Sequence, residues 1–148
     1  MKRTHIVIHH TASKTWANVV TQGKHKVAPF HYGLELKGNR ILIHKGPNIL
    51  EPASATKHYN DSAIHIAAVG DFDKTTPPPS LLLALAVFTS DLAFIFGVPI
   101  DHIVGHSELP AASTSITCPG LTFNLDKFRD KVIAAFPRLS KNLTSIPL

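Results

Sequence analysis

The chain has 148 residues, of which 44% are hydrophobic and 17% charged, a balance typical of a soluble globular protein. This length suits one domain with its own core, and the single cysteine excludes an internal disulfide. A formal net charge of +5 favours an anionic partner, such as nucleic acid, anionic lipid or a wall polymer. Because the basic residues are scattered rather than clustered, we expect no nucleic-acid partner.

The N-terminal sequence does not match the pattern of a secretory signal peptide. Met1, Lys2 and Arg3 start a basic segment, but histidines interrupt the apolar run that follows it. We therefore expect synthesis in the cytoplasm, where the lone thiol stays reduced.

Predicted strands and helices alternate along the chain. The pattern predicts strands at 5–12, 30–36, 40–44 and 63–69, with a tight turn at 37–39, and helices at about 13–24, 81–96 and 124–136. The apolar 81–96 segment is too short for the membrane and carries Asp91, so we predict a central buried helix and no stable membrane insertion. The prediction is an α/β fold with a central mixed sheet flanked by helices, as one domain at 1–136 and a basic, low-structure tail at 137–148.

The first predicted strand ends in two histidines. Alternation along a strand places His10 on one face with Ile6 and Ile8, and His9 on the other face with Val7. A strand end is held by the sheet but opens to a cleft, so one of the pair is suited to a site. A plain surface pair is the alternative.

The only cysteine lies in a polar loop late in the chain. Cys118 follows His106 by twelve residues, in the motifs Gly-His-Ser-Glu and Thr-Cys-Pro-Gly. A thiolate and an imidazole are two of the three protein ligands that a catalytic zinc needs. A buried cysteine that packs as a small hydrophobic residue is the alternative.

The order of these motifs resembles the zinc-dependent N-acetylmuramoyl-L-alanine amidases, the family of phage amidase lysozymes and peptidoglycan recognition proteins. The resemblance spans roughly 5–136, and the segments 30–38 and 63–73 contribute to it. It implies Zn²⁺ bound by His9, His106 and Cys118, with an open fourth position for water. It also implies cleavage of the amide bond between N-acetylmuramic acid and L-alanine, with His10 as a neighbour that does not bind the metal.

Further site residues follow from the same resemblance. His58 matches a position at the cleft wall, and His31 matches a second-strand histidine that is either a core residue or at the site edge. Phe30 directly precedes His31, and Thr117 directly precedes the expected zinc ligand Cys118. We therefore count four residues as candidate substrate contacts: His58, His31, Phe30 and Thr117.

Three positions depart from the family pattern. Relatives usually carry a tyrosine at Phe30, a lysine or threonine at Ile116 and, where they use an acidic base, a glutamate at Ala67. By strand periodicity Tyr32 shares a face with Phe30, and His65 shares one with Ala67, so both are candidate catalytic residues. His65 titrates near neutrality and is the preferred general base, and a metal site that works without a base is the alternative.

The resemblance therefore predicts a zinc amidase of bacterial peptidoglycan, in the form of a monomeric phage-type endolysin. Such a protein is made in the host bacterial cytoplasm and acts on the cell wall after release. Loss of the three usual proton-handling side chains leaves a second hypothesis open, a non-catalytic module that binds muropeptides on the same scaffold.

Overall fold

A five-stranded mixed sheet forms the centre of the molecule, as predicted. The computed structural model describes residues 2–22 and 27–144. The elements are β1 His5–His10, α1 Trp16–Gln22, β2 Tyr32–Lys37, β3 Arg40–Lys45, β4 Ala63–Ala68, α2 Pro79–Phe96, β5 Ile103–Gly105 and α3 Leu125–Thr144. Short 3₁₀ turns cover Ile100–His102 and His106–Glu108.

The strand order is β3-β2-β4-β1-β5. The β2–β3 hairpin is antiparallel, and its turn uses Gly38 at φ 64°. The other three pairings, β2–β4, β1–β4 and β1–β5, are parallel. Their carboxyl ends therefore lie at one edge of the sheet, which is where open α/β sheets commonly bind ligands.

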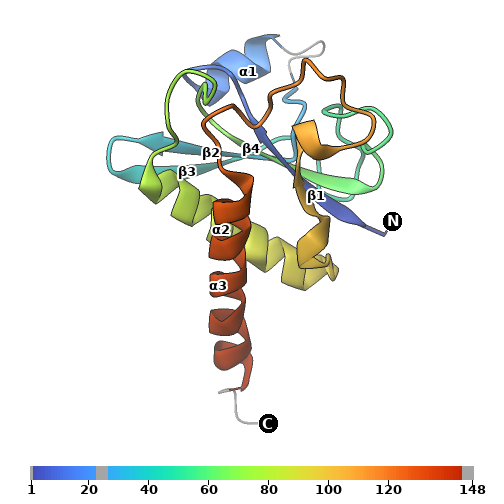
Figure 1. Cartoon of the computed structure of the whole chain (residues 1–148), viewed down its shortest axis with the longest axis vertical. Helices are drawn as coiled ribbons and strands as arrows, with labels where there is room; N and C mark the ends of the chain where they lie inside the picture. The colour runs from blue at the N-terminus through green and yellow to red at the C-terminus, as the bar shows by residue number, and fades with distance from the viewer. Residues whose placement is uncertain (1, 23–26, 145–148) are drawn as a thin grey trace.

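Helices cover both faces of the sheet (Figure 1). The main core lies between the sheet and the pair α2 and α3, and it contains Ile6 and Ile8 of β1. Trp16 and Val19 of α1 pack on the opposite face, next to Ala67 of β4. The predicted alternation along the first strand is thus confirmed, because Val7 belongs to a cluster separate from that of Ile6 and Ile8.

Helix α2 differs from the predicted central helix, because only one side of it is buried. It begins after Pro78, ends at Gly97 in the left-handed conformation, and has a mean hydropathy of 1.9. By length and composition alone it could cross a membrane, yet its inner side packs on the sheet. Its outer side exposes four large apolar residues: Leu83, Val87, Phe94 and Ile95.

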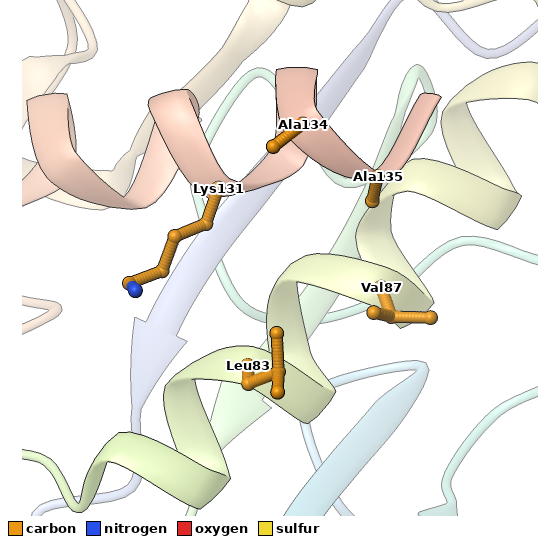
Figure 2. A pocket seen from close by; sticks show the side chains of 5 residues that line it. All are labelled: Leu83, Val87, Lys131, Ala134 and Ala135. Atoms are coloured by element: carbon orange, nitrogen blue, oxygen red, sulfur yellow. The ribbon is translucent and has the colours of Figure 1, made fainter. Parts of the chain in front are cut away.

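A shallow apolar groove of about 200 Å³ runs between α2 and α3. Figure 2 shows Leu83 and Val87 from α2 opposite Lys131, Ala134 and Ala135 from α3. Both helices lie on the sheet face of Ile6 and Ile8, whereas alternation directs His9 to the other face. The groove is therefore separate from the predicted metal site.

Helix α3 corrects the predicted C-terminal tail. It runs through Phe136 and Pro137 to Thr144, so most of the segment expected to have little structure is helical. Its last turns extend past α2, away from the sheet (Figure 1). Residues 145–148 lie outside the described part of the chain.

Candidate metal centre

Three side chains predicted as metal ligands meet at the carboxyl edge of the parallel strands. His9 lies near the end of β1, His106 follows β5 directly, and Cys118 comes from the loop before α3. One ligand atom from each lies within 4.8 Å of the others. The sheet brings His9 and His106 together because β1 and β5 are paired in parallel.

His9 is almost completely buried, at 1% exposure. Its Nδ1 lies 3.5 Å from the Cys118 sulfur, and its Nε2 lies 2.9 Å from Nδ1 of His65. Burial, followed by the neighbouring His65 and His106, holds the pKa of His9 well below its usual range. His9 is therefore neutral at pH 7, as a metal ligand must be.

The segment after β4 holds the Cys118 loop. The Asp73 carboxylate accepts hydrogen bonds of 2.9 Å from the Thr117 hydroxyl and from the Leu121 amide. Gly120, at φ 121°, lies so close to Phe72 that a Cβ would be 2.5 Å from the Phe72 carbonyl carbon. The bond between Cys118 and Pro119 is cis. The two hydrogen bonds to Asp73 and the packing of Gly120 on Phe72 hold both sides of Cys118 against the sheet edge.

The turn that carries His106 is anchored to α3. The Glu108 carboxylate accepts the Gly105 amide at 2.9 Å and forms two bonds with the Arg129 guanidinium, at 2.8 and 3.0 Å. The His106 ring lies 5.0 Å from the His9 ring, and burial lowers the pKa of His106. Two neutral imidazoles thus converge on one thiol.

The chemistry of this donor set fits zinc. Burial raises the pKa of the Cys118 thiol to about 12, an effect that the His10 backbone amide partly offsets and the Asp73 carboxylate reinforces. A cation is therefore needed to stabilise the thiolate here, and zinc deprotonates a thiol that coordinates it. Two imidazole nitrogens and one thiolate match the ligand set of catalytic zinc sites.

The profile of one protein family, described as N-acetylmuramoyl-L-alanine amidase, matches residues 1–121. The chain belongs to this amidase family. It is an N-acetylmuramoyl-L-alanine amidase of peptidoglycan, as the sequence predicted. Among curated protein sequences no significant match is found.

Solved structures resemble the amidase in fold. The N-acetylmuramoyl-L-alanine amidase LysC from Clostridium intestinale has a TM-score of 0.75 at 19% identity, over 90% of this chain and 87% of that one. The Ph2119 endolysin, from a Thermus scotoductus bacteriophage, has a TM-score of 0.61 at 24% identity, over 89% of this chain and 86% of that one. Drosophila peptidoglycan recognition protein SA has a TM-score of 0.66 at 19% identity, over 84% of this chain and 76% of that one. The predicted amidase and recognition-protein fold is thereby confirmed.

Two candidate substrate contacts of the amidase lie beside the predicted metal ligands. The Phe30 ring is 4.8 Å from the His9 ring, centre to centre. Thr117 precedes Cys118 in the loop, although its hydroxyl is already bound to Asp73. Phe30 therefore contributes an apolar wall, and Thr117 helps to hold the loop.

The other two candidate contacts do not join the site. His31 is fully buried; its Nδ1 accepts the His65 amide at 3.0 Å and its Nε2 donates to the Glu51 carbonyl at 2.9 Å. It is a core residue, so its prediction as a substrate contact was wrong. His58 is exposed in the loop before β4, at φ 69°. Among the described residues no hydrogen bond links His58 to the three ligands, and its substrate role stays a prediction.

Tyr32 lies on the wrong face of the sheet to act at this site. Strand β2 begins at Tyr32, so the two-residue period does not extend back to Phe30. The Tyr32 ring packs edge-on against Phe88 of α2 at 5.1 Å, in the core opposite His9. The structure therefore corrects its prediction as a catalytic residue.

His65 shares a face with Ala67, as predicted, but it lies behind His9 and not in an open cleft. It is fully buried, and its two nitrogens contact His9 Nε2 and the Tyr59 carbonyl. Burial lowers the pKa of His65 to about 4. With no nitrogen left to receive a proton from water, His65 does not fit the predicted role of general base.

His10 and Asp73 complete the surroundings of the amidase site. His10 accepts the Phe72 amide on Nδ1 at 3.0 Å, in agreement with its predicted role as a packing neighbour. Sequence reasoning did not identify Asp73 as the residue that holds the Cys118 loop. The segment 63–73 contributes to the family resemblance, but no sequence pattern links Asp73 to a loop 44 residues away.

Proposed function

We propose that His9, His106 and Cys118 hold a zinc ion with which this amidase hydrolyses the bond between N-acetylmuramic acid and L-alanine. The observation that carries the proposal is the convergence of the three ligand atoms within 4.8 Å, at the edge of the sheet where parallel strands end. When bound, zinc supplies a Lewis acid that polarises an amide carbonyl and lowers the pKa of water to about 7.

The residues of the chain supply the position and surroundings of that chemistry. His9 is buried and neutral, and Asp73 and Glu108 hold the segments that carry Cys118 and His106. The Phe30 ring covers one side of the His9 imidazole and keeps water from it. Because apolar residues occupy Phe30, Ala67 and Ile116, the proposed reaction proceeds without a proton acceptor at those three positions.

We propose further that the protein is a monomeric phage-type endolysin. It would be made in the host bacterial cytoplasm and act on the cell wall after release, without stable insertion in the membrane. The fold likeness to LysC and the Ph2119 endolysin supports this assignment. The net charge of +5 also suits an anionic wall polymer.

Substitution of Cys118 by serine tests the zinc site. We expect C118S to lose bound zinc, measured by metal analysis of the purified protein, and to lose lysis of isolated cell walls. Ser107→Ala is the matched control: it changes a hydroxyl beside His106 and should retain both properties. If C118S keeps the zinc content and lytic rate of the wild type, the ligand assignment is wrong.

The second hypothesis is a non-catalytic module that binds muropeptides on the same scaffold. It is favoured by the apolar residues at the three proton-handling positions and by the likeness to recognition protein SA. Mass spectrometry of peptidoglycan after incubation with the protein separates the two functions. New L-alanine amino termini, with intact glycan strands, exclude the binding module; unchanged peptidoglycan with measurable binding favours it.

A further inference from the structure

A chain of two imidazoles connects the metal centre to the protein backbone. Nε2 of His9 lies 2.9 Å from Nδ1 of His65, and Nε2 of His65 lies 3.1 Å from the carbonyl oxygen of Tyr59. The exposed fractions of His9 and His65 are 1% and 0%. Water therefore does not compete for these bonds.

The backbone carbonyl of Tyr59 fixes the donor and the acceptor in both hydrogen bonds of this series. A carbonyl only accepts, so Nε2 of His65 must carry the proton. In a neutral ring Nδ1 of His65 is then an acceptor, and Nε2 of His9 must donate to it. The remaining nitrogen of His9, Nδ1, is left with its lone pair, and it is the nitrogen that lies 3.5 Å from the Cys118 sulfur.

We propose that His65 is a positioning residue that locks His9 in the tautomer with the proton on Nε2, so that Nδ1 is free to bind the metal. This inference rests on the zinc site proposed above. It assigns to His65 a role that acts through His9, without contact to substrate or water. Metal-binding histidines usually donate their second N–H to a carboxylate, carbonyl or water; here a second imidazole takes that place.

His65 is itself held rigidly enough for this role. It lies on β4 beside β1, on the same face as His9, and its strand neighbour across the pairing is Val7. Its amide donates to Nδ1 of His31 at 3.0 Å, and its carbonyl accepts the His31 amide at 2.9 Å. Backbone and ring are thus both fixed, and the His9 imidazole cannot rotate without breaking a buried hydrogen bond.

A neutral acceptor also sets the charge of the centre. A carboxylate in place of the His65 ring would bring a buried negative charge next to a site that already carries one thiolate. With imidazole as the acceptor, two neutral ligands and one thiolate leave a divalent metal with a net charge of +1. A positive centre is the better Lewis acid toward an amide carbonyl.

The first experiment measures the tautomers in the metal-free wild type. Nitrogen-15 NMR of labelled histidine, with long-range ring correlations, distinguishes a protonated Nε2 from a protonated Nδ1. We expect His9 and His65 both to carry the proton on Nε2. A His9 ring protonated on Nδ1 would overturn the proposal, whatever the metal affinity.

The second experiment compares zinc affinities of variants by competition with a chromophoric chelator. H65L removes the acceptor at similar volume and should weaken zinc binding by roughly 10–100-fold, the usual effect of losing such a partner. H65N keeps an oxygen near the position of Nδ1 and should restore most of the affinity. H102L is the matched control, because His102 is bonded to the Thr4 carbonyl, near the opposite end of β1.

The outcomes separate this inference from the zinc proposal. Wild-type protein that binds no zinc but shows the expected tautomers would contradict the zinc site and leave the hydrogen-bond chain intact. H65L that folds and binds zinc as tightly as the wild type would contradict the positioning role alone. Cobalt substitution adds a spectroscopic check, since the sulfur-to-cobalt absorption band should change in H65L and not in H102L.

Discussion

The aromatic ring of Phe30 lies 4.8 Å from the imidazole of His9, centre to centre, and has 9% of its surface exposed. In the family pattern that the sequence resembles, a tyrosine stands at this position, so one hydroxyl separates this wall of the site from that pattern. We predict that F30Y increases the rate of amide cleavage by at least about tenfold, since a positioned acid or base contributes roughly 10²–10⁴-fold. The initial rate on a soluble muropeptide measures the effect.

Tyr32 provides the matched control for this change. Its ring packs on Phe88 of α2, on the sheet face opposite His9. Y32F should therefore leave the cleavage rate unchanged, although it removes a phenol hydroxyl only two residues from Phe30. A F30Y variant that binds zinc but cleaves no faster would show that the ring at position 30 does not face the reacting bond.

The sequence predicted the strands and their faces well, because the runs at β1 and β4 are apolar and rich in branched residues. Alternation inside β1 correctly separated His9 from His10. The meeting of His9, His106 and Cys118 followed from the family resemblance, since no local pattern joins residues more than 90 positions apart.

The predictions for Tyr32 and His65 failed because each applied a local rule outside the context in which that rule holds. Tyr32 was paired with Phe30 by the period of a strand, but β2 begins only at Tyr32. His65 was considered as a base because histidine titrates near neutrality. In the fold, however, His65 is buried and hydrogen-bonded to the Tyr59 carbonyl and to His31. These partners come from separate segments and form no sequence pattern.

His31 makes the stability of the metal-free protein depend on pH. Burial lowers the pKa of His31 from 6.5, and its Nδ1 must stay unprotonated to accept the His65 amide. The folded-state pKa lies below the unfolded value, so the unfolded chain takes up the proton first as the pH falls. The stability contributed by neutral His31 is present above pH 6.5 and is lost as the pH falls through the folded-state pKa.

We therefore predict that the free energy of unfolding decreases from pH 7 to pH 5, measured by denaturant titration of the metal-free protein. In H31N the amide oxygen stands in for Nδ1 but does not titrate, so the decrease should be smaller even if the variant is less stable at pH 7. The denaturant m-value should stay constant, which shows that both proteins unfold in the same way. Equal slopes for both proteins would contradict the role of His31.

The net charge of +5 predicts that binding to whole walls is partly electrostatic. The Debye length falls from about 10 Å at 0.1 M salt to about 3 Å at 1 M, which weakens attraction between exposed charges. Lysis of isolated walls should slow as salt is added, whereas cleavage of a small soluble muropeptide should change little. An equal response of both substrates would show that scattered lysines and arginines do not concentrate the enzyme on its polymer.

The carboxylate of Asp73 links the segment after β4 to the loop that carries Cys118. The Leu121 amide and then the Thr117 hydroxyl hold the pKa of Asp73 below its usual range, so it is ionised at neutral pH and accepts both bonds. We predict that D73N weakens zinc binding by roughly 10–100-fold, because an amide keeps only one accepting oxygen and turns its NH2 group toward the other donor, which is left unpaired. T117V removes only the bond to the hydroxyl and should have a smaller effect in the same direction.

Asp130 offers the control for this last prediction, because it is an exposed aspartate of α3 on the other side of the sheet. D130N makes the same chemical change without contact to the Cys118 loop, and its zinc affinity should equal that of the wild type. Chelator competition measures all three variants under one set of conditions. If D73N and D130N bind zinc equally well, the loop places Cys118 without help from Asp73, and the close packing of Gly120 on Phe72 must be sufficient to hold it.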